Sequence, residues 1–472
     1  MSPLILLVIG LIVVLGGILV VKLHPILALL LGAVIVGFLT SDQDLQQYAV
    51  SKGLSEVQTK NLLGQQLGTR IAIAFGDTCE KIGLLIVFAS IIGKCMLDSG
   101  AAERIVRSML RIFGEKKAPA SFMVSGFVLA IPIFFDTVFY LMVPLARAMG
   151  IRNEKSYALY IMAIVAGGTM AHSLVPPTPG PLFAAGAFGV SVGMMIIMGT
   201  LVGLVASGAG LAYGFWLNKR QHIPLRTTSD TSVEELKTWL NKDTAQLPSF
   251  FMANLPIALP VILIAGNTII KSLTIAVPSE IRSFFQVTGD PVIALLFATI
   301  TALFVLSKQT SFKVRELKKP VEEAIFSAGP IILITASGGA FGAMLQQTSI
   351  GTWLMNISGD YKLALLPLAW FIAAVMRTAQ GSATVSIITA VGMLTVFNTP
   401  GALSFHPVYL AVVIGCGSKL FPWMNDSGFW IICKMSGFTE GETIRNFSLL
   451  LTVMGVAGLA FTMLLAKIFP LI

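Results

Sequence analysis

Long apolar runs separated by short polar segments dominate the chain. A bilayer core about 30 Å thick requires roughly 20 apolar residues per spanning helix, and most of the runs reach that length. The pattern predicts about ten transmembrane helices, near residues 3–21, 25–40, 71–97, 156–175, 182–217, 250–271, 290–307, 326–346, 407–434 and 444–468. The predicted fold class is therefore an all-α polytopic membrane protein.

Two further apolar stretches contain polar residues near their middle. Residues 119–146 are interrupted by Asp136-Thr137, and residues 363–396 by the segment Arg377–Ser382. Polar groups at membrane depth are tolerated where protein or a wet cavity satisfies them, but not against lipid. Each stretch is therefore predicted to form a re-entrant hairpin, which enters and leaves the membrane on the same side.

Composition and charge support a membrane location. The 472 residues are 55% hydrophobic and only 12% charged, whereas soluble globular chains carry about 25% charged residues. A net charge of +9 would suit a nucleic-acid-binding protein, but many of the Lys and Arg residues lie in the short loops 98–118, 147–155, 218–249 and 308–320. By the positive-inside rule these loops face the cytoplasm of a bacterial inner membrane, and both termini then lie in the periplasm.

The chain divides into two halves of similar organisation. Residues 1–217 and 250–472 flank the polar linker 218–249, which is predicted to be cytoplasmic. Each half contains two spans, a third span, a hairpin, an interrupted span and a final span, and the two halves start from opposite sides of the membrane. The interrupted spans lie near 156–181 and 407–434.

Weak internal similarity supports a repeat. In the third spans, Ala89-Ser90 followed by Met96-Leu97 is similar to Ala336-Ser337 followed by Met344-Leu345, with an offset of one residue. Inverted repeats with broken helices are typical of secondary transporters, whose site lies near the membrane midplane. The sequence therefore predicts a transporter built from two inverted repeats.

Both interrupted spans contain residues that cannot continue a lipid-facing helix. The first carries three prolines between Pro176 and Pro179, and the second carries Gly415–Lys419 followed by Trp423–Gly428. Proline removes an amide donor and stops the helix. Broken helix ends leave free N–H groups and a positive dipole that can hold a carboxylate. The alternative is that both breaks are only kinks.

Arg377 stands just before the predicted turn of the second hairpin. A guanidinium at membrane depth must be paired or face a cavity, and its planar fork suits a carboxylate; alternatively, the side chain reaches the periplasmic surface and anchors the hairpin. Gln380, Ser382 and Thr384 offer donors and acceptors to sugar hydroxyls, and Gly381 permits close approach of the backbone. Capping of the two half-helices is the other interpretation of these polar residues.

Asp136, Asp426 and His172 are the candidates for ion coupling. Asp136 follows two phenylalanines, and an ionisable group in an apolar setting is suited to carrying a proton. Asp426 occupies the corresponding place in the second half, and a free histidine titrates near neutral pH. Helix capping by the aspartates and a structural role for the histidine are the alternatives. Thr178 and Asn425, at the two breaks, are further candidates to bind substrate hydroxyls.

These motifs resemble those of the gluconate:proton symporter (gluconate permease) family, and the resemblance covers nearly the whole chain. Residues 377–384 look like the family's R-x-A-Q-G-S-A-T segment, residues 425–430 look like N-D-[AS]-G-F-W, and residues 172–181 are similar to H-x-[FL]-[VL]-P-P-H-P-G-P. Two positions depart from the family pattern. Thr178 stands in place of the second histidine, and Asp136 in place of the glutamate that usually follows the paired aromatics.

The resemblance implies import of a sugar acid with protons by a fold similar to the ion-transporter superfamily, with a scaffold, a mobile transport domain and often a homodimer. Family members carry different hydroxy acids or D-serine, so the implied substrate is a class that includes gluconate. The hypothesis is a symporter that works by alternating access without a cofactor or a bound metal. Protons are the expected coupling ion, and sodium is the alternative because unwound backbone can coordinate it.

An intramembrane enzyme and a channel are the alternatives from other functional classes. Four scattered histidines, with no H-E-x-x-H or G-x-S-x-G motif in the sequence, argue against an enzyme. Two hairpins that occlude a site fit a carrier better than a channel. The sequence therefore predicts a transport protein whose partners are a small carboxylate and membrane lipids, and not nucleic acid.

Overall fold

The computed structural model describes residues 3–114, 117–226, 246–272, 277–310, 314–348, 362–397, 403–424 and 426–471, and every regular element in these ranges is a helix. Within these described ranges, six helical segments are long and apolar enough to cross a membrane, and the number is eight if each of two sharply bent pairs of helices counts as one span. The other two predicted spans correspond to shorter helices, α1 (Pro3–Leu19) and α20 (Val408–Gly417). The chain is a multi-pass membrane protein.

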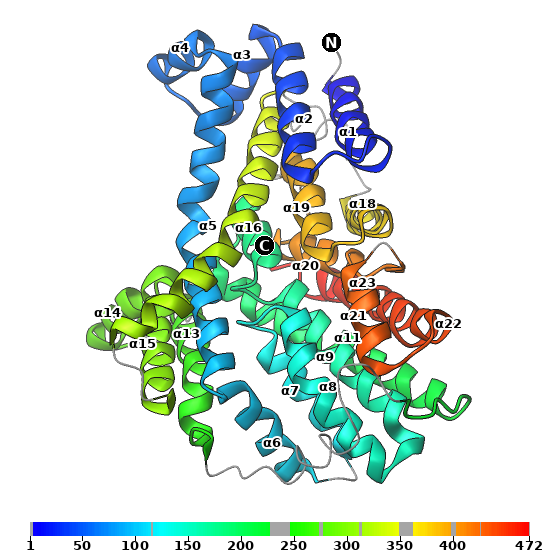
Figure 1. The fold of residues 1–472 in the computed structure, drawn as a ribbon. Helices are drawn as coiled ribbons and strands as arrows, with labels where there is room; N and C mark the ends of the chain where they lie inside the picture. Colours follow the sequence, from blue (N-terminus) through cyan, green and yellow to red (C-terminus); the bar gives the residue numbers. More distant parts are fainter. Residues whose placement is uncertain are drawn as a thin grey trace.

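Two long helices run side by side through the middle of the molecule. These helices are α5 (Leu67–Asp98) and α16 (Lys318–Gln346), the third spans of the two halves (Figure 1). Helix α16 also packs against α2 (Pro25–Leu39), and α5 packs against α15 (Pro291–Thr310). The first pair of helices in each half thus contacts the long helix of the other half.

Glycines on α16 allow its neighbours to approach closely. A Cβ atom at Gly339 would collide with Thr78 of α5, and one at Gly342 would lie 2.9 Å from the carbonyl oxygen of Gly392. Gly392 belongs to α19 (Ala383–Leu394), so α16 is held between the other long helix and an arm of the second hairpin. Any larger side chain at these positions would push the helices apart.

Paired helices occupy both ranges in which hairpins are predicted. In the first half, α7 (Ala118–Leu129) and α8 (Phe135–Arg152) are joined by residues 130–134. In the second half, α18 (Leu365–Gln380) is joined to α19 by Gly381 and Ser382. Gly381 has φ of 80°, a left-handed conformation that glycine adopts without strain and that ends α18 sharply.

The helices α9 (Tyr157–Leu174) and α10 (Pro179–Ala187) form the first broken span, and α20 and α21 (Ser427–Ser436) form the second. The final span of the first half was predicted to begin at residue 182, but residues 182–187 belong to α10. The final helix of the first half, α11 (Val192–Asn218), begins ten residues later than predicted, after Gly189 with φ of 67° and the capping residue Ser191. A helix stop and a new N-cap therefore lie inside a single apolar run.

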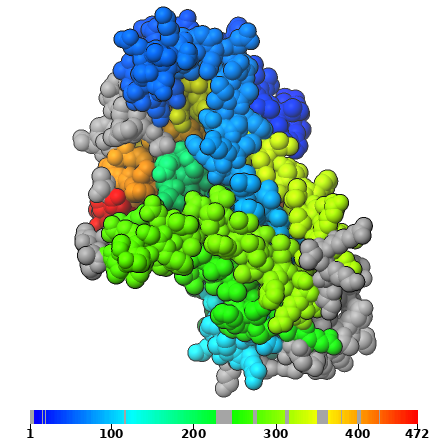
Figure 2. Space-filling model, turned by 90° about the vertical axis from the view of Figure 1, so that its left-hand side faces the viewer, coloured from blue at the N-terminus to red at the C-terminus, as the bar shows by residue number. Residues whose placement is uncertain are grey.

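The remaining elements surround this framework. Helices α13 to α15 form a band across one face, below α3 to α5 (Figure 2). Large apolar side chains such as Ile262, Phe284 and Phe304 are exposed there, as is typical of a lipid-facing surface. The helices not yet described are α3 (Asp42–Ser51), α4 (Glu56–Gly64), α6 (Ala101–Phe113), α13 (Phe250–Ser272), α14 (Ser279–Thr288), α22 (Glu440–Thr443) and α23 (Leu449–Ile468). The short helical turns are η2 (Glu154–Ser156), η4 (Val314–Leu317), η5 (Lys362–Ala364), η6 (Thr395–Phe397) and η7 (Ile444–Ser448).

The basic segments gather at one end of the molecule. Helix α6 and the C-terminal end of α8 lie at the lower end of Figure 1, opposite α3 and α4. These are among the segments that the positive-inside rule places in the cytoplasm. Most of the predicted linker, residues 227–245, lies outside the described residues.

Candidate functional site

A cavity of about 170 Å³ lies where the second hairpin, the first hairpin and both broken spans meet. Its wall is partly apolar, with Phe134, Phe135, Phe447 and Leu451. Its polar side chains come from both halves of the chain. They are Asp136, Thr169, His172, Arg377, Ser382, Thr384, Lys419, Asp426 and Ser427.

Three helices begin at this cavity. Helix α8 starts at Phe135, α19 at Ala383 and α21 at Ser427, and the first residues of all three line the wall. The first turn of a helix has free N–H groups and a partial positive charge, which together attract anions. Convergence of three N-termini makes the cavity suitable for a negatively charged ligand.

Arg377 and Asp426 form an ion pair that joins the second hairpin to the second broken span. Both side chains are buried, at 4% and 5% exposure. The Arg377 guanidinium also donates to the carbonyl oxygen of Gly381, and Asp426 accepts a hydrogen bond of 2.7 Å from the Gly428 N–H. Arg377 therefore lies in the interior and not at a membrane surface, and Asp426 is the N-cap of α21.

Asp136 lies beside this pair, in the first turn of α8. A Cβ atom at Gly428 would lie 3.2 Å from Oδ1 of Asp426 and 3.7 Å from Oδ1 of Asp136. The two carboxylates thus flank a glycine that leaves the space between them open. Asp136 forms no ion pair within the part of the chain that the structure describes.

Lys419 supplies a second cation, which the sequence analysis did not select. Its side chain is 2% exposed, and its Nζ atom donates a hydrogen bond of 2.5 Å to Oγ of Ser173. A lysine that follows the apolar run of α20 was the available signal, because an ionisable residue at membrane depth marks a functional site. Thr169, one helical turn before Ser173 on α9, also lines the cavity without having been selected.

His172 lies on the same wall. Its Nε2 atom is 3.5 Å from Oγ1 of Thr384, and its ring contacts Phe134 edge-on at a centroid distance of 5.7 Å. Its Nδ1 atom is buried and has no hydrogen-bond partner among the described residues. The histidine therefore lies in the cavity wall with one ring nitrogen near Thr384 and the other without a partner among the described residues.

Two of the predicted residues, Thr178 and Gln380, are described by the structure and do not line the cavity. Thr178 is buried, donates a hydrogen bond of 2.6 Å to the Val175 carbonyl, and lines a separate small pocket with Ser90. Gln380 has a buried side-chain amide with no partner among the described residues, but it is not part of the wall. Asn425 lies outside the described residues. Gly381, Ser382 and Thr384 do line the cavity, and Ser382 also caps α19.

The opposite end of α21 is held by two side chains from the first half of the chain and one from the start of the linker. Three consecutive carbonyl oxygens, of Met435, Ser436 and Gly437, accept hydrogen bonds. The donors are Arg147 at 2.8 Å, Tyr157 at 2.7 Å and Arg226 at 2.8 Å, respectively. The last carbonyls of a helix have no partner within the helix, so these donors satisfy groups that would otherwise be unpaired.

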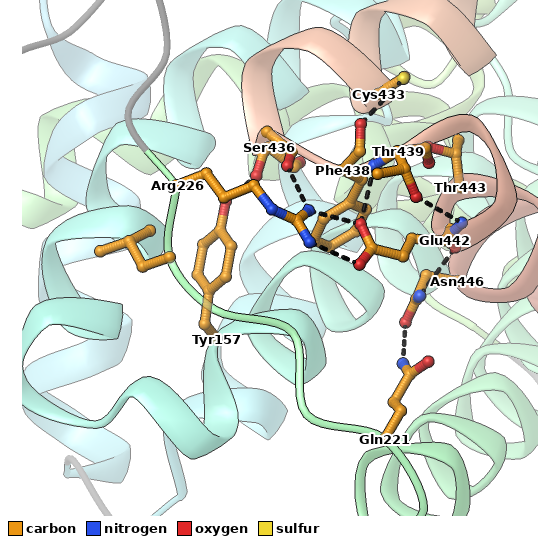
Figure 3. A network of polar contacts seen from close by, with 12 residues as sticks. Tyr157, Gln221, Arg226, Cys433, Ser436, Phe438, Thr439, Glu442, Thr443 and Asn446 are labelled. Carbon is orange, nitrogen blue, oxygen red and sulfur yellow. Dashed lines mark hydrogen bonds and ion pairs between the residues drawn. The ribbon is translucent and has the colours of Figure 1, made fainter.

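Arg226 also forms a two-pronged ion pair with Glu442 of α22, with N–O distances of 2.6 and 2.8 Å (Figure 3). We refer to Arg147, Tyr157, Arg226 and Glu442 as the brace. Helix α21 has ten residues, or about 15 Å of length. The brace therefore fixes one end of a short rod whose other end forms part of the cavity.

Comparisons with known proteins agree with this architecture. The family described as GntP family permease matches residues 2–468. The gluconate permease of Pseudomonas aeruginosa is 30% identical over 95% of this chain and 94% of its own length. The Gnt-II system L-idonate transporter of Escherichia coli K12 is 26% identical over 93% of each chain. These relatives are transporters, which indicates a transport function and not an enzymatic one.

The fold is also seen in a solved transporter structure. The crystal structure of the YdaH transporter of Alcanivorax borkumensis, described as having an unusual topology, matches with a TM-score of 0.61. The match covers 86% of this chain and 89% of that chain at 14% sequence identity. Similarity at this level concerns the fold alone.

Proposed function

Because the chain belongs to the GntP permease family, we propose that it is a secondary active symporter that imports gluconate or a related sugar acid together with protons. The observation that carries this proposal is the cavity at which three helix N-termini, two cations and two carboxylates meet. The substrate carboxylate binds near the helix N-termini and the cations Arg377 and Lys419. Thr169, Ser382 and Thr384 bind its hydroxyl groups.

Charge balance supports proton coupling. The cavity contains Arg377 and Lys419 as cations, and Asp136 and Asp426 as carboxylates. A bound acid adds one negative charge, and an unbalanced charge is costly to bury. A proton on Asp136, the carboxylate without an ion pair in the described ranges, restores the balance. Movement of the acid therefore requires movement of the proton in the same direction.

Transport proceeds by alternating access. The two hairpins and two broken spans form the mobile body around the cavity, and α5 and α16 form the scaffold against which that body moves. The protein lies in the bacterial inner membrane with both termini in the periplasm, as the basic loops indicate. It assembles as a homodimer, which light scattering of the purified protein would test.

Uptake of labelled gluconate into proteoliposomes tests the function. An inward proton gradient is expected to drive accumulation with or without sodium, and related sugar acids are expected to compete. Accumulation that requires a sodium gradient would replace the proton with sodium, for which the unwound backbone at the two breaks provides carbonyl ligands. Absence of uptake for gluconate and every competing acid, under either gradient, would overturn the substrate assignment.

A further inference from the structure

The two cations in the cavity differ in what they already bind. The Arg377 guanidinium is bonded to the Asp426 carboxylate and to the Gly381 carbonyl. Lys419 donates only to the hydroxyl of Ser173, and it forms no ion pair with any residue that the structure describes. One cation is therefore neutralised before a substrate enters, and the other is not.

We propose that Lys419 binds the substrate carboxylate, and that Arg377 is a positioning residue that holds the turn of the second hairpin against the start of α21. This inference rests on the proposed function, because it concerns the acid group of the same substrate. It assigns a role to a residue that the sequence motifs did not single out.

The geometry of the two broken spans explains how Lys419 is held at this place. Helix α9 ends at Leu174, and α20 ends at Gly417, two residues before Lys419. A Cβ atom at Gly415 would lie 2.6 Å from the Ser173 carbonyl oxygen, so only glycine allows the helices to cross so closely. The C-terminal ends of both helices then lie near the ammonium group, and their partial negative charge stabilises a cation.

The bonding capacity of the ammonium group leaves room for a ligand. A lysine ammonium has three N–H donors and no acceptor. Ser173 uses one donor, and the side chain lines the cavity that receives three helix N-termini. A carboxylate placed there would pair with Lys419 without breaking an existing ion pair. Arg377 also has unused donors, among them Nε, but its charge is already compensated by Asp426, so a second carboxylate gains less from Arg377 than from Lys419.

The test compares gluconate with gluconamide, in which a neutral amide replaces the carboxylate. Calorimetry on the purified full-length protein measures the two dissociation constants in the wild type and in K419Q. We expect the wild type to prefer gluconate, and K419Q to lose about 10- to 100-fold of that preference because one charge-assisted contact is removed. We expect R377Q/D426N, which removes both charges of the buried pair, to weaken both ligands by similar factors and to leave the preference unchanged.

Two further variants complete the experiment. K434Q removes an exposed lysine of α21 that packs on Trp430 and does not line the cavity, so it should keep the wild-type preference. K419R keeps the charge and should keep the preference for gluconate even if the affinity falls. This variant also tests the assignment if K419Q does not fold. An unchanged preference in K419Q, a preference lost in K419R, or a preference lost in R377Q/D426N but kept in K419Q would overturn the assignment.

The outcomes separate this inference from the proposed function. If the wild type binds no sugar acid, the substrate class is wrong. If the wild type binds gluconate or another aldonate and K419Q discriminates against the matching amide as strongly, only the role of Lys419 is wrong.

Discussion

Helix α21 has an arginine–carboxylate pair at each end, and the two pairs differ in their surroundings. At the N-terminal end, Arg377 and Asp426 have side-chain exposures of 5% and 6%. Beyond the C-terminal end, Arg226 and Glu442 have exposures of 37% and 22%. The same kind of ion pair thus occurs once in the buried cavity and once in a partly exposed position.

The comparison shows that similar ion pairs carry different costs. Removing one partner of a buried pair leaves an uncompensated charge, which costs about 3–5 kcal/mol, whereas a solvent-exposed pair contributes about 1 kcal/mol or less. The inner pair shapes the cavity, and the outer pair sets the position of the helix that carries part of it. Variants of the two pairs should therefore differ both in size of effect and in the step that they alter.

The largest effect is expected from Arg377→Ala. The substitution leaves Asp426 charged and unpaired in the interior, so uptake should fall by at least about 100-fold, and the melting temperature of the purified protein should fall as well. Uptake in proteoliposomes and thermal unfolding measure the two effects. Removal of both charges in R377A/D426A should restore part of the thermal stability. An unchanged melting temperature in Arg377→Ala would contradict the claim that this ion pair is buried and stabilises the fold.

Asp136→Asn tests the other carboxylate of the cavity, which has no arginine partner in the described ranges. An amide cannot exchange a proton, so a proton gradient should no longer drive accumulation of gluconate. Exchange of external labelled gluconate for internal gluconate should continue, because that process moves no net proton. Continued proton-driven accumulation in this variant would show that another group carries the proton.

Arg226→Gln breaks the brace without touching the cavity. The variant loses a two-pronged ion pair and a hydrogen bond to Gly437, so the position of α21 becomes less defined. We expect KM for gluconate to rise by about tenfold, or about 1.4 kcal/mol. Arg220→Gln is the matched control, because Arg220 stacks on Trp216 at 4.3 Å and is not part of the brace. Equal KM values for gluconate in Arg226→Gln and Arg220→Gln would show that the brace does not influence substrate binding.

Tyr157→Phe should have the smallest effect. It removes one neutral hydrogen bond to the Ser436 carbonyl, worth about 0.5–1 kcal/mol, and should raise KM by about two- to fivefold. Tyr140→Phe, on an exposed tyrosine of α8, provides the control. An effect larger than that of Arg226→Gln would mean that Tyr157 is the main support of α21.

Sequence patterns predicted the helical architecture better than the cavity. Proline and glycine stop helices locally, so the break after Leu174 and the turn at Gly381 are visible in the sequence. The pairing of Arg377 with Asp426 joins residues that are 49 positions apart, and no local rule specifies it. The family relationship that the motifs suggested is confirmed by the match over residues 2–468.

Individual roles were harder to predict because a polar side chain can serve the backbone instead of a ligand. Thr178 was predicted to bind substrate, but its hydroxyl bonds to the Val175 carbonyl within the break. Lys419 was overlooked because its partner, Ser173, lies 246 positions away in the other half. The brace was equally hidden, since Arg226 follows the last helix of the first half and meets α22 only in the folded chain.

Backbone N–H groups at the three helix N-termini have a consequence for how this family diverges. A point mutation replaces a side chain, but it leaves the amide of a non-proline residue in place. The backbone contribution to binding an acid group is therefore kept when side chains change, whereas Thr169, Ser382 and Thr384, which we propose to bind hydroxyls, can change one at a time. If these roles hold, we expect single substitutions at the three positions to change which sugar acid binds while the backbone contribution to acid binding is kept.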